Sequence, residues 1–136
     1  ELEVLKGTTG TQKAIIDHVF TAQDIVALQQ LTREVHITDE QMIRINRLVR
    51  ASRPADSPSE YVKTWCEWGA GPRAGQALVL CAKARAILKG RYSVIPEDID
   101  ILIFPVLRHR IALNFRAEAE GITTDHVIAS LLNVIK

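Results

Sequence analysis

Residues 72–90, PRAGQALVLCAKARAILKG, have the composition and the end signals of an α-helix. Proline is favoured at the first position of a helix and glycine just beyond the last, where Pro72 and Gly90 stand. Alanines recur between them, and basic residues gather near the C-terminal end, where the helix dipole favours cations. We therefore predict a close-packed central helix. The side predicted to face the core consists of Ala74, Leu78, Cys81, Ala84 and Leu88.

Four other segments also carry helix signals. Thr21 and Thr38 each precede, by three residues, a side chain that can complete a capping box, and the second of these helices is predicted over about 39–52. Pro96 opens another helix, which Pro105 must kink or end. Thr123 or Thr124 caps the last one. The apolar stripes of the first, second and last segments are Ile25, Leu28, Leu31, Val35; Met42, Ile45, Leu48, Val49; and Val127, Ile128, Leu131, Leu132, Ile135.

These signals predict an all-α fold, a helical bundle of about five main helices. The length of 136 residues and the 47% apolar content favour one domain that folds on its own. Residues 59–68, SEYVKTWCEW, are predicted to form a helical turn or loop that carries Trp65 and Trp68 into the core. Residues 1–20 are predicted to hold a short helix, a Gly/Thr-rich loop and an extended segment, AIIDHVF.

The composition and the motifs of the chain argue against several classes of function. The formal net charge of +1 and the few aromatic residues argue against a nucleic-acid-binding surface. Neither a phosphate-binding loop nor a metal-ligand spacing is present, so no metal site is expected. The sequence lacks both a leader and a membrane-spanning apolar run, which favours a cytoplasmic protein. Cys66 and Cys81 are predicted to be buried free thiols.

Two basic stretches need a separate interpretation. In RINRLVRASR the arginines stand at every third position, which predicts one broad solvated band on a helix. Its members are Arg44, Arg47, Arg50 and Arg53. In LRHR, by contrast, Arg108 and Arg110 are expected to meet another part of the same assembly.

Arg73 is the candidate functional residue. It follows the proline that begins the central helix, where exposed N–H groups and the positive end of the helix dipole disfavour a cation. One interpretation is a solvated arginine at a helix start. The other is an anion site, in which the guanidinium and the free N–H groups bind a phosphate. Position alone leaves both open.

Three segments in this order resemble the C-terminal part of MoxR-type AAA+ ATPases. They are LTREVHITDEQMIRINRLVRASRP, WGAGPRAGQALVLCAKARAILKGRYSVIPEDID and PVLRHRIALNFRAEAEG. The opening ELEVLKGTTG is similar to the junction between the α/β nucleotide-binding core and the helical lid of such proteins. The resemblance covers nearly the whole chain, so we expect residues 1–136 to be a single lid domain, with 1–20 as the junction from an upstream core.

The resemblance implies a role for the start of the central helix. In this family the element G-x-[SG]-P-R-A is the second sensor, which makes Arg73 the catalytic residue that reaches the γ-phosphate. Together, Gly71, Pro72 and Arg73 are implied to contact ATP. Many relatives carry serine in place of Gly71, so the resemblance does not imply a side-chain hydrogen bond to nucleotide at this position.

The resemblance also implies which functions lie outside this chain and which partners it has. ATP and Mg would be bound by the upstream core, so we expect the fragment alone to be inactive as an ATP hydrolase. The implied partners are that core, neighbouring subunits of a ring homo-oligomer and von Willebrand factor A-type domain proteins. Chaperone-like remodelling, metal insertion or complex assembly is the implied function. The alternative is a stand-alone helical protein–protein interaction module, which a phosphate-binding loop upstream of Glu1 would exclude.

Overall fold

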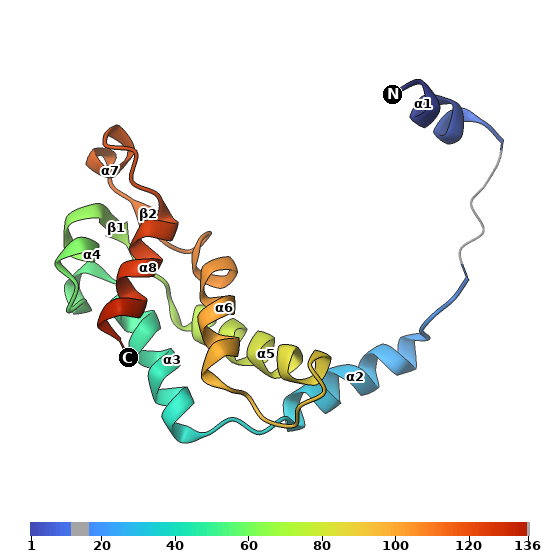
Figure 1. The fold of residues 1–136 in the computed structure, drawn as a ribbon, viewed down its shortest axis with the longest axis horizontal. Helices are drawn as coiled ribbons and strands as arrows, with labels where there is room; N and C mark the ends of the chain where they lie inside the picture. Colours follow the sequence, from blue (N-terminus) through green and yellow to red (C-terminus); the bar gives the residue numbers. More distant parts are fainter. Residues whose placement is uncertain (12–16, 136) are drawn as a thin grey trace.

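The fold is a bundle of helices with one small two-stranded sheet, given by a computed structural model that describes residues 1–11 and 17–135 (Figure 1). The helices are α1 (Leu2–Thr9), α2 (Ala22–Glu34), α3 (Asp39–Ala51), the 3₁₀ helix η1 (Pro54–Asp56), α4 (Glu60–Trp65), α5 (Pro72–Leu88), α6 (Pro96–Leu107), α7 (Phe115–Ala119) and α8 (Thr124–Val134). The strands are β1 (Cys66–Trp68) and β2 (Ala112–Leu113). The five longest helices, α2, α3, α5, α6 and α8, confirm the predicted all-α class.

The predicted helix boundaries agree closely with the structure. Thr21 and Thr38 both form capping boxes, and the Thr123 hydroxyl accepts a hydrogen bond from the His126 backbone N–H at 3.3 Å. Gly90, just past α5, has the positive φ of 70° that glycine tolerates without strain. Pro105 does not end α6, which continues to Leu107.

Helix α5 lies at the centre of the bundle, in contact with α2, α3 and α6, as predicted (Figure 1). Its buried residues recur at every fourth position: Ala74, Leu78, Ala82 and Ala86. Small side chains along this line let neighbouring helices approach closely. The predicted face was wrong at Cys81, which is exposed, and at Leu88, which is 85% exposed. The real stripe follows the i, i+4 line through Ala82 and Ala86, so both residues lie outside it.

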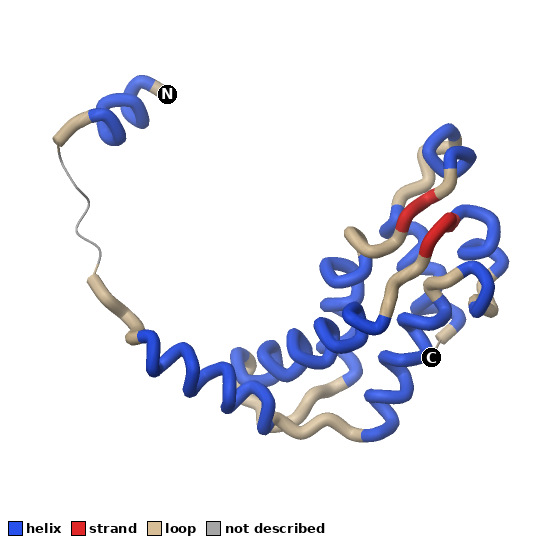
Figure 2. The backbone as a smooth tube through the Cα atoms, turned by 180° about the vertical axis from the view of Figure 1, so that it is seen from behind, coloured by secondary structure: helices blue, strands red, loops and turns tan. Residues whose placement is uncertain are grey.

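Residues 60–68 differ from the predicted turn or loop. They form helix α4 followed by strand β1, which pairs antiparallel with β2 through Cys66 and Leu113 (Figure 2). Trp65 packs against the core, as predicted, with its ring centroid 6.2 Å from that of Tyr61. The prediction for Trp68 was wrong, because this side chain is 69% exposed. In a regular strand Cys66 and Trp68 would share a face, but the pairing register shifts between them, and only Cys66 is buried.

The N-terminal part carries apolar residues that the bundle does not cover. Neither α1 nor α2 contains a buried residue, and Ile25, Leu28 and Leu31 of the predicted stripe are each more than 40% exposed. Figure 1 shows α2 along the end of α5 and continuing away from the bundle. Helix α3, of the same length, buries Ile45, Leu48, Val49 and Ala51. The periodicity predicted both helices correctly but not how deeply each is buried.

Part of the predicted N-terminal organisation lies outside the described residues. Helix α1 continues to Thr9, into the stretch predicted as a Gly/Thr-rich loop. The predicted extended segment spans residues 14–20, of which 14–16 are not described. Residues 17–20 have no regular secondary structure, so no strand forms there.

Candidate functional site

The candidate site is the first turn of α5. Gly71 is the N-cap residue, with an extended backbone at φ −90° and ψ −179°, and Pro72 is the first helical residue. Arg73 follows, exposed to solvent, and its side chain forms no hydrogen bond or ion pair with any residue that the structure describes. The structure thus brings the three predicted site residues together on one exposed helix start.

No other helix start in the described part of the chain resembles this one. Every other α-helix there has an aspartate or glutamate in its first turn, and α5 has none. Gly71 supplies no side-chain cap: its carbonyl oxygen accepts from the Ala74 N–H at 3.0 Å, and no side chain among the described residues accepts from the first turn of α5. An exposed cation beside such groups is a chemical environment that suits a bound anion.

A groove of about 610 Å³ runs between α3 and α5 beside this turn. Pro72, Gly75 and Gln76 line it from α5, and Arg53 lines it from the residues that follow α3. Arg73 is not among its lining residues. An anion that met Arg73 would therefore lie at the exposed end of α5 and would need further ligands from outside the described residues.

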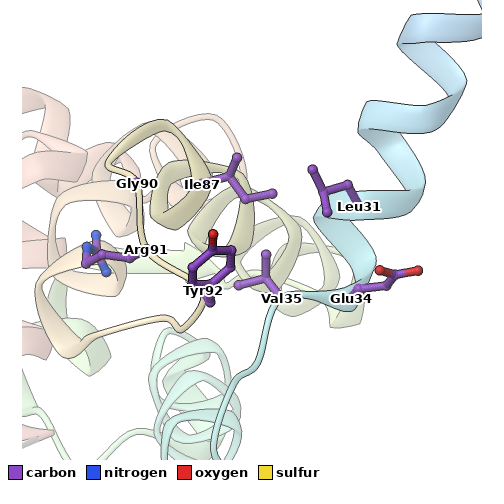
Figure 3. A pocket seen from close by; sticks show the side chains of 7 residues that line it. All are labelled: Leu31, Glu34, Val35, Ile87, Gly90, Arg91 and Tyr92. Carbon is purple, nitrogen blue, oxygen red and sulfur yellow. The ribbon is translucent and has the colours of Figure 1, made fainter.

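A second cavity, of about 360 Å³, lies at the opposite end of α5 (Figure 3). It is lined mainly by apolar side chains, among them Leu31 of α2 and Ile87 of α5. The charged ends of Glu34 and Arg91 point away from each other (Figure 3). Because polar groups do not converge on it, this cavity has no arrangement for chemistry.

The strongest electrostatic cluster surrounds Asp98, at the start of α6. Its carboxylate is 1% exposed and accepts two hydrogen bonds from Arg91, at 2.7 and 2.9 Å. The backbone N–H of Ile95 donates a third at 3.0 Å, and Arg85 Nε lies 3.1 Å away. Burial raises the pKa of Asp98, but the hydrogen bonds from Arg91 and Ile95 outweigh it and hold the pKa below its ordinary value. The cluster fixes the α5–α6 turn.

The predicted solvated band of arginines is only partly present. Arg47 and Arg50 are exposed, as expected. The prediction was wrong for Arg44, which donates to Asp100 at 2.7 Å, and for Arg53, whose Nε donates to the carbonyl oxygen of Ala70 at 2.9 Å. A three-residue spacing drifts around the helix, so its ends reach different neighbours.

In the second basic stretch, Arg108 forms an ion pair within its own chain. It donates to both carboxylate oxygens of Asp125, at 2.8 and 2.9 Å. These bonds raise the pKa of Arg108 and lower the pKa of Asp125. Arg110 is half-buried, and its Nε has no hydrogen-bond partner among the described residues.

The two cysteines occupy different environments. Cys66 is buried, as predicted, and burial raises the pKa of its thiol to about 11. The thiolate fraction at neutral pH is therefore very small. The prediction was wrong for Cys81, which is exposed beside Gln29 and Thr32 of α2.

The described residues offer neither a metal site nor a membrane-spanning helix. No group of three or more His, Cys, Asp or Glu side chains there could hold a metal ion. No helix in the same ranges has the length and apolar character that crossing a membrane requires.

Comparison with known proteins places these features in a family. Residues 59–131 match the AAA lid domain family. The chaperone MoxR1 of Mycobacterium tuberculosis is 31% identical over 118 residues, which are 86% of this chain and 31% of MoxR1. The uncharacterized protein YeaC of Bacillus subtilis is 32% identical over 127 residues, covering 83% of this chain and 40% of YeaC.

A solved structure supports the same placement. The crystal structure of a candidate ATPase from Cytophaga hutchinsonii superposes with a TM-score of 0.86 and 32% identity, over 99% of this chain and 42% of that one. This chain thus spans less than half the length of each of these three proteins. The segment that matches the AAA lid domain family, residues 59–131, includes the whole of α5 with Gly71, Pro72 and Arg73. The chain belongs to the AAA lid domain family and is the lid of a MoxR-type AAA+ protein.

Proposed function

We propose that this lid works in an ATP-driven ring machine and that Arg73 is its second sensor, contacting the γ-phosphate of ATP. The observation that carries the proposal is the exposed Arg73 on a helix start that has no acidic residue and no side-chain cap. A cation is disfavoured there unless an anion approaches it. Gly71 and Pro72 would contact the nucleotide through their backbone and ring.

ATP and Mg would supply the reacting phosphate and its charge neutralisation, both held by an α/β core elsewhere in the polypeptide. Phosphoryl transfer depends mainly on electrostatic stabilisation and positioning. A planar guanidinium can bind two phosphate oxygens at once, so Arg73 would stabilise the developing charge. Because Arg73 stands on a separate helical domain, this contact would couple hydrolysis to closure of the lid on the core.

The wider function follows the family. We propose residues 1–136 as a single lid domain, with residues 1–20 as the junction to the core. In a ring homo-oligomer, the lid of one subunit would contact the core of the next. Release of phosphate would then shift the lid and, through this contact, the neighbouring subunit. Chaperone-like remodelling fits the relation to a protein named chaperone MoxR1. The resemblance described above adds partners of the von Willebrand factor A type to this proposal. We propose the cytoplasm as its location.

The test is Arg73→Ala in the full-length protein. We expect ATP turnover at saturating ATP to fall roughly ten- to a thousandfold, equivalent to about 1.5–4 kcal/mol of transition-state stabilisation. Nucleotide affinity should change little, because the core still holds the nucleotide. Arg73→Lys should restore activity only in part, because an ammonium lacks the planar fork. Wild-type turnover by a folded, assembled Arg73→Ala protein would contradict the proposal.

The matched control is Lys89→Ala, which removes an exposed positive charge at the far end of α5 and should leave turnover unchanged. Arg85 is unsuitable as a control, since it lies 3.1 Å from the buried Asp98 and its loss would disturb the fold.

A second test uses the 136-residue chain alone. We expect no ATP hydrolysis and at most very weak binding, because one arginine and one helix start cannot replace a full phosphate-binding site. Calorimetry with Mg-ATP checks this. Micromolar affinity would show that the chain itself contains the site, and would favour a different arrangement from the one proposed.

A further inference from the structure

The three residues before α5 are held against the end of α3. Ala70 is buried between two glycines and has both of its backbone polar groups bound there. Its N–H donates to the Ser52 hydroxyl at 2.9 Å, and its carbonyl oxygen accepts from Arg53 Nε at 2.9 Å. Two consecutive side chains thus bind one residue from both sides.

The packing beside Ala70 leaves no free space. A Cβ at Gly69 would lie 2.5 Å from the backbone nitrogen and Cα of Arg53 and even closer to the Ser52 carbonyl oxygen. The two backbones therefore touch, which only glycine allows at this position. Ser52 is itself fixed, because it is fully buried and its hydroxyl donates to the Val49 carbonyl oxygen at 2.6 Å.

This anchor matters because the start of α5 has little else to hold it. A side-chain cap and an acidic first-turn residue usually stabilise a helix start, and α5 has neither. Gly69 and Gly71 on either side of Ala70 also favour backbone freedom. The hydrogen bonds to Ala70 thus provide the fixed point from which Pro72 and Arg73 project.

We infer that Arg53 is a positioning residue: with Ser52 it holds Ala70, and through Ala70 it orients Arg73 toward the nucleotide. This inference rests on the proposed role of Arg73 for its effect on hydrolysis, but the anchoring itself can be measured separately. Arg53 is suited to a test because its side chain is 36% exposed, so it can be changed without emptying the core.

The matched control is Arg50, on the last turn of α3. Arg50 and Arg53 both lie within 4 Å of the Asp56 carboxylate, with N–O distances of 3.9 and 3.8 Å. Only Arg53 donates to Ala70. Replacing each by methionine removes the same charge and the same pairing with Asp56, so a difference between the two variants reports the bond to Ala70.

The experiment uses the full-length protein with Arg53→Met, Arg53→Lys, Ser52→Ala and Arg50→Met. Amide hydrogen exchange in the segment 70–74 should be about three- to tenfold faster in Arg53→Met and Ser52→Ala than in wild type. It should be unchanged in Arg50→Met. Arg53→Lys should lie between, because lysine can donate a hydrogen bond but lacks the fixed guanidinium plane.

Steady-state kinetics then connect the anchor to Arg73. Arg53→Met should lower kcat about three- to tenfold, with KM for ATP within twofold of wild type. In an Arg73→Ala background the same change should have no further effect, because the group that it positions is gone.

Two results would overturn the inference. One is that Arg53→Met behaves like Arg50→Met in both amide exchange and kcat. The other is that Arg53→Met lowers kcat in the Arg73→Ala background by the same factor as in the wild-type background. If Arg73→Ala itself leaves turnover unchanged, the proposed function fails. The exchange data would then still decide whether Arg53 anchors the start of α5.

Discussion

Among the α-helices that the structure describes, α5 and α6 begin with a proline, and their first turns are otherwise opposite. After Pro96 come two acidic residues, and Asp98 is buried with its carboxylate bound by Arg91 and the Ile95 N–H. After Pro72 comes a cation that is exposed and has no partner among the described residues. The charged first-turn group of α6 thus has all of its partners within the domain, whereas the charged first-turn group of α5 has none among the described residues.

The difference shows which helix start serves stability and which is available for function. A buried carboxylate with several hydrogen-bond donors holds a turn in place, and it has no remaining capacity for a ligand. An exposed arginine at a positive helix end contributes nothing to the fold, and it keeps all of its donors free. The predictions below test this contrast by making one start resemble the other or by breaking one of them.

The largest effect is expected from Arg73→Glu, which gives α5 the acidic first turn of α6. The acid favours the helix dipole, so the 136-residue chain should gain about 0.3–1 kcal/mol in free energy of unfolding. In the full-length protein, the carboxylate would repel the γ-phosphate, and turnover should fall by about a thousandfold or more, equivalent to about 4 kcal/mol. Urea denaturation and an ATPase assay measure the two effects. A loss of stability together with normal turnover would contradict the functional assignment of the α5 start.

Asp98→Asn removes the bound carboxylate from the first turn of α6. It should destabilise the 136-residue chain by about 3 kcal/mol, because it leaves two arginines beside a neutral buried group. Urea denaturation followed by circular dichroism measures the loss. Asp100→Asn is the control, since Asp100 pairs with Arg44 but is 42% exposed. Exposed pairs contribute less than about 1 kcal/mol. Equal losses in the two variants would show that burial of Asp98 does not matter.

Acid should weaken the same cluster in wild type. The folded-state pKa of Asp98 lies below its ordinary value of about 3.9, so its contribution to stability is complete above that value. It is lost as the pH falls through the lower, folded-state pKa. Stability measured from pH 6 to pH 2 should therefore decline more steeply below about pH 4 in wild type than in Asp98→Asn. Parallel curves would contradict this.

The sequence predicted local features well because they depend on neighbours along the chain. The capping boxes at Thr21 and Thr38, the proline starts and the exposed position of Arg73 are set within a few residues. Prediction from the sequence failed where a segment distant along the chain determines the burial or the partner of a side chain. Trp68 is exposed on a strand whose register with β2 shifts between Cys66 and Trp68, and Arg53 leaves the solvated band because Ala70 lies beside it.

The function could be inferred from sequence only through the family resemblance. A lone arginine at a helix start has two interpretations, and the ordinary solvated one is as consistent with its spacing as an anion site. The anchor at Ala70 gives no separate sequence signal, because Ser52 and Arg53 are polar residues at a helix end, where such residues are common. Their partner is 17 or 18 positions away, and only the fold brings it into contact.

The smallest expected effect comes from Gly71→Ser, which gives the N-cap of α5 a side-chain hydroxyl. The backbone of Gly71 is extended, and a Cβ there would meet nothing within 4 Å, so serine fits. Its hydroxyl can accept a first-turn N–H and should stabilise the chain by a few tenths of a kcal/mol, a Tm increase of roughly 1–2 °C. Gly71→Ala is the matched control, because it adds the Cβ without the hydroxyl and should lower Tm slightly. Turnover of the full-length protein should remain within twofold of wild type, since Arg73 is unchanged. If serine and alanine shift Tm equally, the start of α5 is not limited by its missing cap, and the contrast with α6 rests on charge alone.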